Sequence, residues 1–178
     1  MVAPLRRAIF FDRDGVLNKA IVKNGKPYPP LKISELVVNS EAANVIKFFK
    51  NRNFLCIVIT NQPDVGRRKV KKKIVNQINF ILKKKIKFDD IYTCFHRNNY
   101  SFDKKPMPGM ILKAKKKWKI NLSKSYMVGD RYKDILAGLN SSLTTIYLKS
   151  DYKNDKKPKF YHYKVNSLKE VIGKVKYD

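Results

Sequence analysis

The chain has few acidic residues, few cysteines and no long apolar run. Of its 178 residues, 14 are Asp or Glu and 40 are Lys or Arg, so the formal net charge is +26. No apolar run approaches the roughly 20 residues that a membrane helix needs, so we expect no membrane span. The two cysteines, Cys56 and Cys94, make no disulfide framework. Asp12 interrupts the first apolar run, so we expect no signal peptide and a cytoplasmic protein.

The scarcity of acidic residues leaves an excess of positive charge that has two explanations. A field of this sign attracts phosphates, nucleic acids or anionic membrane surfaces. The chain is also rich in Lys, Asn, Ile, Tyr and Phe, which all use A/T-rich codons, so genome composition can account for most of the charge. Nucleic acid therefore stays open as a partner without being favoured, and the charge alone indicates only that an anionic ligand is tolerated.

Short apolar runs alternate with helical patterns along the whole chain. With 43% hydrophobic residues, a chain of this length can bury a full core, and we expect one domain over residues 1–178. Strands that alternate with helices predict an α/β fold with a doubly wound parallel sheet. The strands are predicted at residues 8–11, 54–59, 91–95, 126–128, 143–148 and 163–165.

Turn and capping residues predict further local features. Residues 19–31 contain Gly25 and three prolines, which predict an irregular loop. Ser40 is predicted to cap the helix that ends near residue 53. Ser167 and Glu170 have the spacing of a capping box, which predicts a final helix. No insertion between the predicted elements is long enough to form a large cap domain.

Two carboxylates follow the first predicted strand. Asp12 ends the apolar run, and Asp14 lies two residues further on, before Gly15, which permits a tight turn. Two like charges held this close repel each other, so the arrangement favours a hard cation with oxygen ligands between them. For this motif alone, an acidic turn without chemistry is the alternative.

Polar residues also follow the second and fourth predicted strands. Thr60 and Asn61 can hold phosphoryl oxygens, or they can merely cap a helix. Asp130 supplies a further carboxylate for a cation, and Lys105, held by the proline that follows it, can neutralise nearby anions. Because ligands of open α/β sheets bind at the carboxyl ends of the strands, these residues are predicted to form one site.

These motifs resemble those of the haloacid dehalogenase (HAD) phosphatases. The resemblance rests on residues 10–18, 60–62, 104–110 and 127–134 and extends over nearly the whole chain. Within this superfamily the chain resembles the D-glycero-D-manno-heptose 1,7-bisphosphate 7-phosphatase group, to which histidinol-phosphate phosphatases are close relatives. The resemblance implies a HAD-like, Rossmann-like sheet. It also implies a monomeric, magnesium-dependent hydrolase that removes the 7-phosphate from a small sugar bisphosphate.

The resemblance implies roles for five residues in the chemical step. Asp12 is expected to be the nucleophile that forms an aspartyl-phosphate, and Asp14 the general acid and base. Mg²⁺ would bind the Asp12 carboxylate, the Asp14 backbone carbonyl and Asp130. Thr60 and Lys105 would hold the phosphoryl group during its transfer.

The resemblance also implies substrate contacts, at Asn61, Lys104 and Arg131. Lys104 stands where the family carries Arg, so the two-pronged contact of a guanidinium is lost there. Arg131 stands where a Lys is usual, so the positive charge is kept. The turn after Asn61 also departs from the family, because Pro63-Asp64 replaces a smaller Ser-Gly pair, and this departure bears on which substrate is bound more than on the chemistry.

A loop that binds zinc in many family members is incomplete in this chain. Those members carry Cys-x-His and then Cys-x-Cys shortly before the Lys-Pro pair. This chain has Cys94-x-His96 and then Ser101-x-Asp103, so Cys94, His96 and Asp103 are candidate zinc ligands, but Ser101 is a poor fourth ligand. We therefore expect little bound zinc.

Other functions stay open beside the sugar bisphosphatase. Histidinol phosphate is a second candidate substrate. An open site without a large cap also admits larger substrates, and a polynucleotide 3′-phosphatase activity occurs on this type of domain. The non-enzyme alternative is a basic module that binds anions or nucleic acid, although every expected catalytic position is filled.

Overall fold

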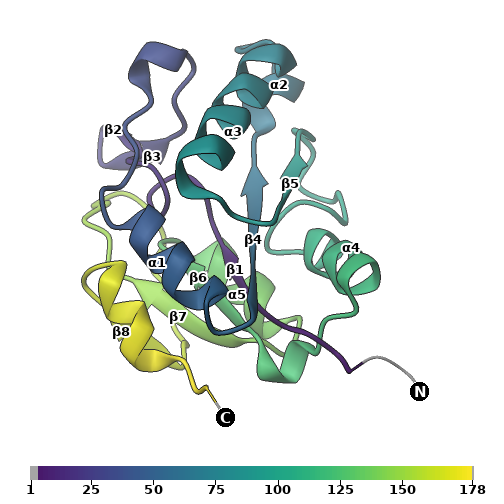
Figure 1. Ribbon diagram of the computed structural model, residues 1–178. Helices are drawn as coiled ribbons and strands as arrows, with labels where there is room; N and C mark the ends of the chain where they lie inside the picture. Colours follow the sequence, from purple (N-terminus) through teal and green to yellow (C-terminus); the bar gives the residue numbers. More distant parts are fainter. Residues whose placement is uncertain (1–3, 178) are drawn as a thin grey trace.

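The computed structural model describes residues 4–177 and contains a six-stranded sheet with helices on both faces (Figure 1). The strand order is β5-β4-β1-β6-β7-β8, and every neighbouring pair is parallel. The predicted α/β fold with a parallel sheet is thereby confirmed. The strands are β1 (Arg7–Phe11), β4 (Phe54–Asn61), β5 (Asp90–Cys94), β6 (Tyr126–Gly129), β7 (Thr144–Leu148) and β8 (Tyr163–Val165).

Helices cover both faces because the strands are apolar on both faces. In β1, Ile9 and Phe11 belong to one core cluster and Ala8 and Phe10 to the other, as the two-residue period of a strand requires. The first cluster is completed by α1 (Ala42–Lys50), α3 (Lys72–Ile86) and the 3₁₀ helix η3 (Lys169–Lys174). The second is completed by α4 (Gly109–Trp118) and α5 (Tyr132–Leu139).

The central strand β1 lies where the chain changes sides of the sheet. The strands β4 and β5 extend the sheet on one side of β1, and β6, β7 and β8 then extend it on the other. At such a point the loops after neighbouring strands separate and leave a crevice. The residues that follow β1, β4 and β6 therefore face a common space.

The predicted irregular loop at residues 19–31 is wrong. β2 (Ile21–Lys23) and β3 (Lys26–Tyr28) form an antiparallel hairpin beside the main sheet. Its turn consists of Asn24 and Gly25, whose φ angles are 49° and 70°. Two positive φ values are what a two-residue hairpin turn of this kind requires, and Asn-Gly is its favoured sequence.

The two capping predictions also need correction. The N-cap of α1 is Glu41, and its backbone N–H donates to the side chain of Asn39 rather than to Ser40. Ser167 and Glu170 do contact each other through their side chains at 3.3 Å. The predicted final helix is present as the 3₁₀ helix η3, whose N-cap is Leu168 rather than Ser167.

Three short elements complete the chain between these strands and helices. They are η1 (Ile33–Glu35), α2 (Pro63–Gly66) and η2 (Leu122–Lys124). Over residues 4–177, none of the helices has both the length and the apolar character needed to cross a membrane.

Candidate active site

A small cavity lies at the carboxyl ends of β1 and β4. Its volume is about 60 Å³. The sequence-predicted residues Asp12, Asp14, Thr60, Asn61, Lys105 and Arg131 all line it, so motifs that are far apart in the chain meet at one place. The hairpin adds Pro27 and Tyr28 to the same wall.

The ammonium group of Lys105 lies among three oxygen acceptors inside the protein. Its Nζ donates to Asp12 Oδ1 at 2.6 Å and to the carbonyl of Ile59 at 2.8 Å, and it forms an ion pair with Asp134 Oδ1 at 2.8 Å. All three N–H groups of the ammonium are thus used. Burial opposes the charge, but Asp12 and Asp134 raise the pKa of Lys105 above its ordinary value. Lys105 is therefore a fixed positive charge beside Asp12.

Asp12 is only 6% exposed as a residue, although it directly follows β1 and lines the cavity. Burial, reinforced by Asp134 and Asp14 and opposed by Lys105, raises the pKa of Asp12 to about 7. The carboxylate therefore needs further positive charge to stay ionised in this position.

Three carboxylates together offer a site for that charge. Asp12, Asp130 and Asp134 each provide an oxygen within 4.8 Å of the other two, the one such group of three potential ligands among residues 4–177. Burial, together with Asp12 and Asp134, raises the pKa of Asp130 well above its ordinary value. Its Oδ1 atom is buried and accepts no hydrogen bond from the described part of the chain. Such an oxygen is costly unless a cation binds it, and an all-oxygen set suits Mg²⁺.

Asp14 is held by three side chains. Arg13 contacts its carboxylate through Nη2 at 2.9 Å, Gln62 donates to it at 2.7 Å, and Asn18 donates at 3.0 Å. The side chain of Asp14 retains 14% exposure, so it reaches the cavity while being fixed in orientation. A carboxylate held in this way can exchange protons with a group bound in the cavity.

Arg13 is completely buried, which the sequence did not predict. Its Nη1 donates to Asn79 Oδ1 at 2.8 Å, and the Asn79 amide donates in turn to Thr93 at 3.2 Å. Only a weak indication of these contacts is present in the sequence, namely that Asn79 is a polar residue on the otherwise apolar face of α3. Together, Arg13 and Asn79 link the Asp14 carboxylate to α3 and β5.

Thr60 and Asn61, at the end of β4, have different partners. The Thr60 hydroxyl accepts a hydrogen bond from Gln62 at 2.9 Å. Asn61 exchanges two hydrogen bonds of 3.0 Å with the backbone of Lys105, one through its amide and one through its carbonyl oxygen. Asn61 therefore fixes the backbone that carries Lys105, besides lining the cavity.

A second cavity of about 220 Å³ shares Asn61 and Arg131 with the first. Lys104 lines it, but its ammonium donates to the carbonyl of Arg97 at 2.8 Å and to Asn99 at 2.9 Å. Arg131 makes two bonds of 2.8 Å to Asp155. Lys104 and Arg131, two of the three predicted substrate contacts, thus lie at the cavity wall and are already held by the protein.

The positive charge of this second cavity includes residues that the sequence analysis did not assign. Arg67 and Lys133 line it together with Lys26, Lys104 and Arg131. Burial, followed by Lys133 and Arg67, lowers the pKa of Lys104. Burial and Arg131 likewise lower the pKa of Lys133. Mutual repulsion among these cations would be relieved by a bound anion.

The three candidate zinc ligands do not come together. Cys94 is a buried thiol at the end of β5, His96 is exposed, and Asp103 forms an ion pair with Lys113. Within residues 4–177, they do not form a group of three close ligands. Lys104 instead fastens part of the same loop through its bonds to Arg97 and Asn99.

Several known proteins that resemble this chain in sequence are named as phosphatases. Residues 19–141 match the family described as haloacid dehalogenase-like hydrolase. A protein of Campylobacter jejuni named D-glycero-alpha-D-manno-heptose-1,7-bisphosphate 7-phosphatase is 31% identical, and the match covers 94% of each chain. A Helicobacter pylori protein, named as the phosphatase of the beta form, is 29% identical and is matched over 96% of this chain and 97% of its own.

Solved structures resemble the fold over nearly its whole length. The structure of a D,D-heptose 1,7-bisphosphate phosphatase from B. bronchiseptica, complexed with magnesium and phosphate, has a TM-score of 0.78 and 19% identity. It is matched over 94% of this chain and 97% of its own. A second phosphatase of that name, from Burkholderia thailandensis, has a TM-score of 0.66, with 16% identity over 95% and 97% of the two chains.

The buried ammonium of Lys105 gives a test by stability. In Lys105→Met, Asp12 and Asp134 lose their buried counter-charge, so we expect the free energy of unfolding to fall by about 3–5 kcal/mol. Urea unfolding at pH 8 in EDTA measures this. The control is Lys113→Met, which removes an exposed ion pair to Asp103 and should change the free energy by less than about 1 kcal/mol. Equal effects of the two substitutions would contradict the described role of Lys105.

Proposed function

Because the chain belongs to the haloacid dehalogenase-like hydrolase family, we propose that it is a magnesium-dependent phosphatase that acts through an aspartyl-phosphate at Asp12. The observation that carries the proposal is the geometry around Asp12. Asp14 lines the same cavity, Lys105 contacts Asp12, and two further carboxylates complete a group that suits a cation. Phosphate-monoester hydrolysis is among the slowest uncatalysed reactions, so this arrangement of nucleophile and positive charge is suited to it.

The reaction would proceed in two displacements at phosphorus. First, an oxygen of Asp12 bonds to phosphorus, the bond to the ester oxygen breaks, and Asp14 gives its proton to the departing oxygen. Next, Asp14 takes a proton from water while the water oxygen attacks phosphorus. The bond between phosphorus and Asp12 then breaks, which releases inorganic phosphate and restores the carboxylate. The contacts from Arg13 and Gln62 would keep Asp14 in place for both transfers.

The phosphoryl group would be surrounded by positive charge and hydrogen-bond donors. Mg²⁺ would be held by the carboxylates of Asp12 and Asp130, with Asp134 beside them, and by the backbone carbonyl of Asp14. Bound there, the ion would reduce the repulsion between the carboxylate nucleophile and the phosphate dianion. Since the Thr60 hydroxyl accepts a bond from Gln62, its own proton is available to a phosphoryl oxygen.

The substrate that we propose is D-glycero-D-manno-heptose 1,7-bisphosphate, cleaved at the 7-phosphate. The relatives with 31% and 29% identity carry this substrate in their names. The second cavity supports a bisphosphate, because a phosphate that is not cleaved can lie near Arg131 and Lys133 while the other is at Asp12. Arg131 already pairs with Asp155, so a second phosphate would add an anion chiefly beside Lys133.

The proposal also covers the organisation of the protein. We propose a single domain over residues 1–178 that acts as a monomer in the cytoplasm. The two core clusters share the same sheet, which supports a single domain. The hairpin and η1 are the only regular elements between β1 and α1, so residues 18–40 supply a flap rather than a large cap.

The nucleophile is tested by Asp12→Asn. A carboxamide is not a nucleophile toward phosphorus, so we expect magnesium-dependent phosphate release to fall below detection while the circular dichroism spectrum stays that of the parent protein. Asp151→Asn, a change of the same kind at an exposed position, should keep parental activity. Near-normal turnover by Asp12→Asn would exclude the aspartyl-phosphate mechanism.

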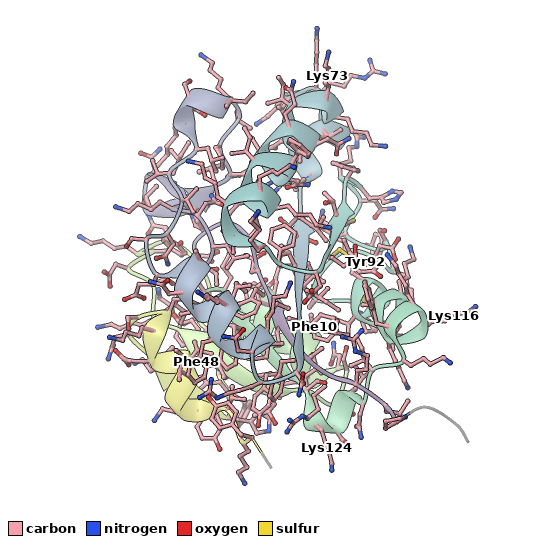
Figure 2. The ribbon with its side chains drawn as sticks, in the orientation of Figure 1. Phe10, Phe48, Lys73, Tyr92, Lys116 and Lys124 are labelled. Atoms are coloured by element: carbon pink, nitrogen blue, oxygen red, sulfur yellow. The ribbon has the colours of Figure 1, made fainter. Side chains whose placement is uncertain are left out.

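Substrate choice is tested by kcat/KM for three compounds and by Lys133→Met. We expect kcat/KM to be higher for heptose 1,7-bisphosphate than for histidinol phosphate or a 3′-phosphorylated oligonucleotide. A charge-assisted hydrogen bond contributes roughly 1.5–3 kcal/mol, so Lys133→Met should raise KM for the bisphosphate about tenfold or more, with a smaller loss in kcat. Because Lys133 also lines the cavity at Asp12, histidinol phosphate should respond to Lys133→Met as well, but less than the bisphosphate. Lys116→Met, on the outer surface of α4, is the control (Figure 2).

A different order of substrates would contradict this assignment. If the oligonucleotide were preferred, and its binding fell by about 10³-fold between 50 and 200 mM salt, a polynucleotide would be the substrate and the net charge of +26 would be functional. If histidinol phosphate were preferred, the second cavity would not be a phosphate site. In both cases the roles proposed for Asp12, Asp14 and Asp130 would remain.

A further inference from the structure

Residues 150–155, which follow β7, hold Asp130 at two points. The Tyr152 hydroxyl donates to Asp130 Oδ2 at 2.6 Å, and the Ser150 hydroxyl donates to the Asp130 backbone carbonyl at 3.0 Å. Tyr152 is only 8% exposed and Asp130 only 2%. A tyrosine hydroxyl is protonated at neutral pH and therefore serves as a donor here. The backbone and the side chain of Asp130 are thus both fixed by a segment distant in sequence.

The two carboxylate oxygens of Asp130 consequently have different surroundings. Oδ2 accepts the Tyr152 bond, whereas Oδ1 is buried and has no hydrogen-bond partner within residues 4–177. Asp130 also belongs to the group with Asp12 and Asp134 that suits a cation. A hydrogen bond to one oxygen of a carboxylate ligand orients the other toward a metal ion.

Gly15 makes room for this contact. Its φ is +93°, and a Cβ atom at this position would lie 1.9 Å from Asp130 Oδ2 and 2.6 Å from the Tyr152 hydroxyl. The Asp130–Tyr152 pair is therefore seated directly against the backbone of the motif that carries Asp12 and Asp14. Any larger residue at 15 would displace the pair or the motif.

The segment that carries Tyr152 is itself fastened at its far end. Asp155 makes two bonds of 2.8 Å to Arg131, and the Asn154 backbone N–H donates to the carbonyl of Gly25 at 2.9 Å. The segment thereby connects the residues after β6 to the hairpin turn. These contacts restrict movement of Tyr152 away from Asp130.

We propose that Tyr152 is a positioning residue for Mg²⁺ binding, which holds Asp130 Oδ2 so that Oδ1 is presented to the ion. This role rests on the proposed function, since that function requires magnesium at Asp12 and Asp130. Tyr152 would not contact the substrate or the reacting phosphorus. Its effect is on the affinity for the ion, through the orientation of one ligand.

The test is calorimetric titration of the full chain with MgCl₂ alone, for the parent protein, Tyr152→Phe and Tyr92→Phe. Removing a hydrogen bond behind a metal ligand commonly weakens metal binding 10- to 100-fold, so we expect at least about a tenfold higher Kd in Tyr152→Phe. The Mg²⁺ concentration for half-maximal phosphatase activity should rise by the same factor. Tyr92→Phe removes a buried hydroxyl from β5, which β4 and β1 separate from β6, and should leave the Kd unchanged (Figure 2).

The calorimetric result does not depend on phosphatase activity, so it separates this proposal from the function on which it rests. If the parent protein binds Mg²⁺ but hydrolyses none of the three phosphate esters, the proposed function fails while the role of Tyr152 is still measured. Two results would overturn the role of Tyr152. One is a folded Tyr152→Phe with the parental Kd. The other is a Tyr152→Phe that stays unfolded in MgCl₂, which would make the contact a requirement of the fold.

Discussion

Four carboxylates lie close together at one edge of the sheet, and the structure depends on how their negative charges are compensated. Asp12 and Asp14 follow β1, and Asp130 and Asp134 follow β6, its neighbour in the sheet. Their negative charges are compensated in three ways. Lys105 lies between Asp12 and Asp134, Arg13 and two amides hold Asp14, and Tyr152 holds one oxygen of Asp130. Among these four carboxylates, the buried Oδ1 of Asp130 has no hydrogen-bond partner in the described chain, and it is the feature that most directly calls for a cation.

The fold brings the carboxylates together because its strands are buried on both faces. A parallel strand covered by helices on either side can be apolar along its whole length, so the first polar residue appears where the strand leaves the core. Directly after β1 that residue is Asp12, and directly after β6 it is Asp130. The chain extends the sheet first on one side of β1 and then on the other, which leaves a crevice at the carboxyl end of β1. Thus the same burial that stabilises the sheet also places the charges at its edge.

Much of this arrangement could be predicted from the sequence, and the failures have physical causes. The strands and the meeting of Asp12 with Lys105 followed from apolar runs and motif order. Arg13 and Tyr152 could not be assigned, because their partners Asn79 and Asp130 are brought to them only by the tertiary fold. The prediction of an irregular loop at residues 19–31 failed for a different reason. Asn24-Gly25 is a local turn signal that favours the hairpin at 21–28 despite the neighbouring prolines.

The central claim is that Asp12 becomes phosphorylated, and borohydride trapping measures it directly. Protein that is turning over substrate with Mg²⁺ is quenched and treated with borohydride, which reduces an aspartyl-phosphate to homoserine and leaves free carboxylates unchanged. Peptide mass spectrometry then locates the product. The mechanism predicts homoserine at position 12, dependent on both substrate and Mg²⁺. Homoserine at another aspartate, or none during active turnover, would contradict it.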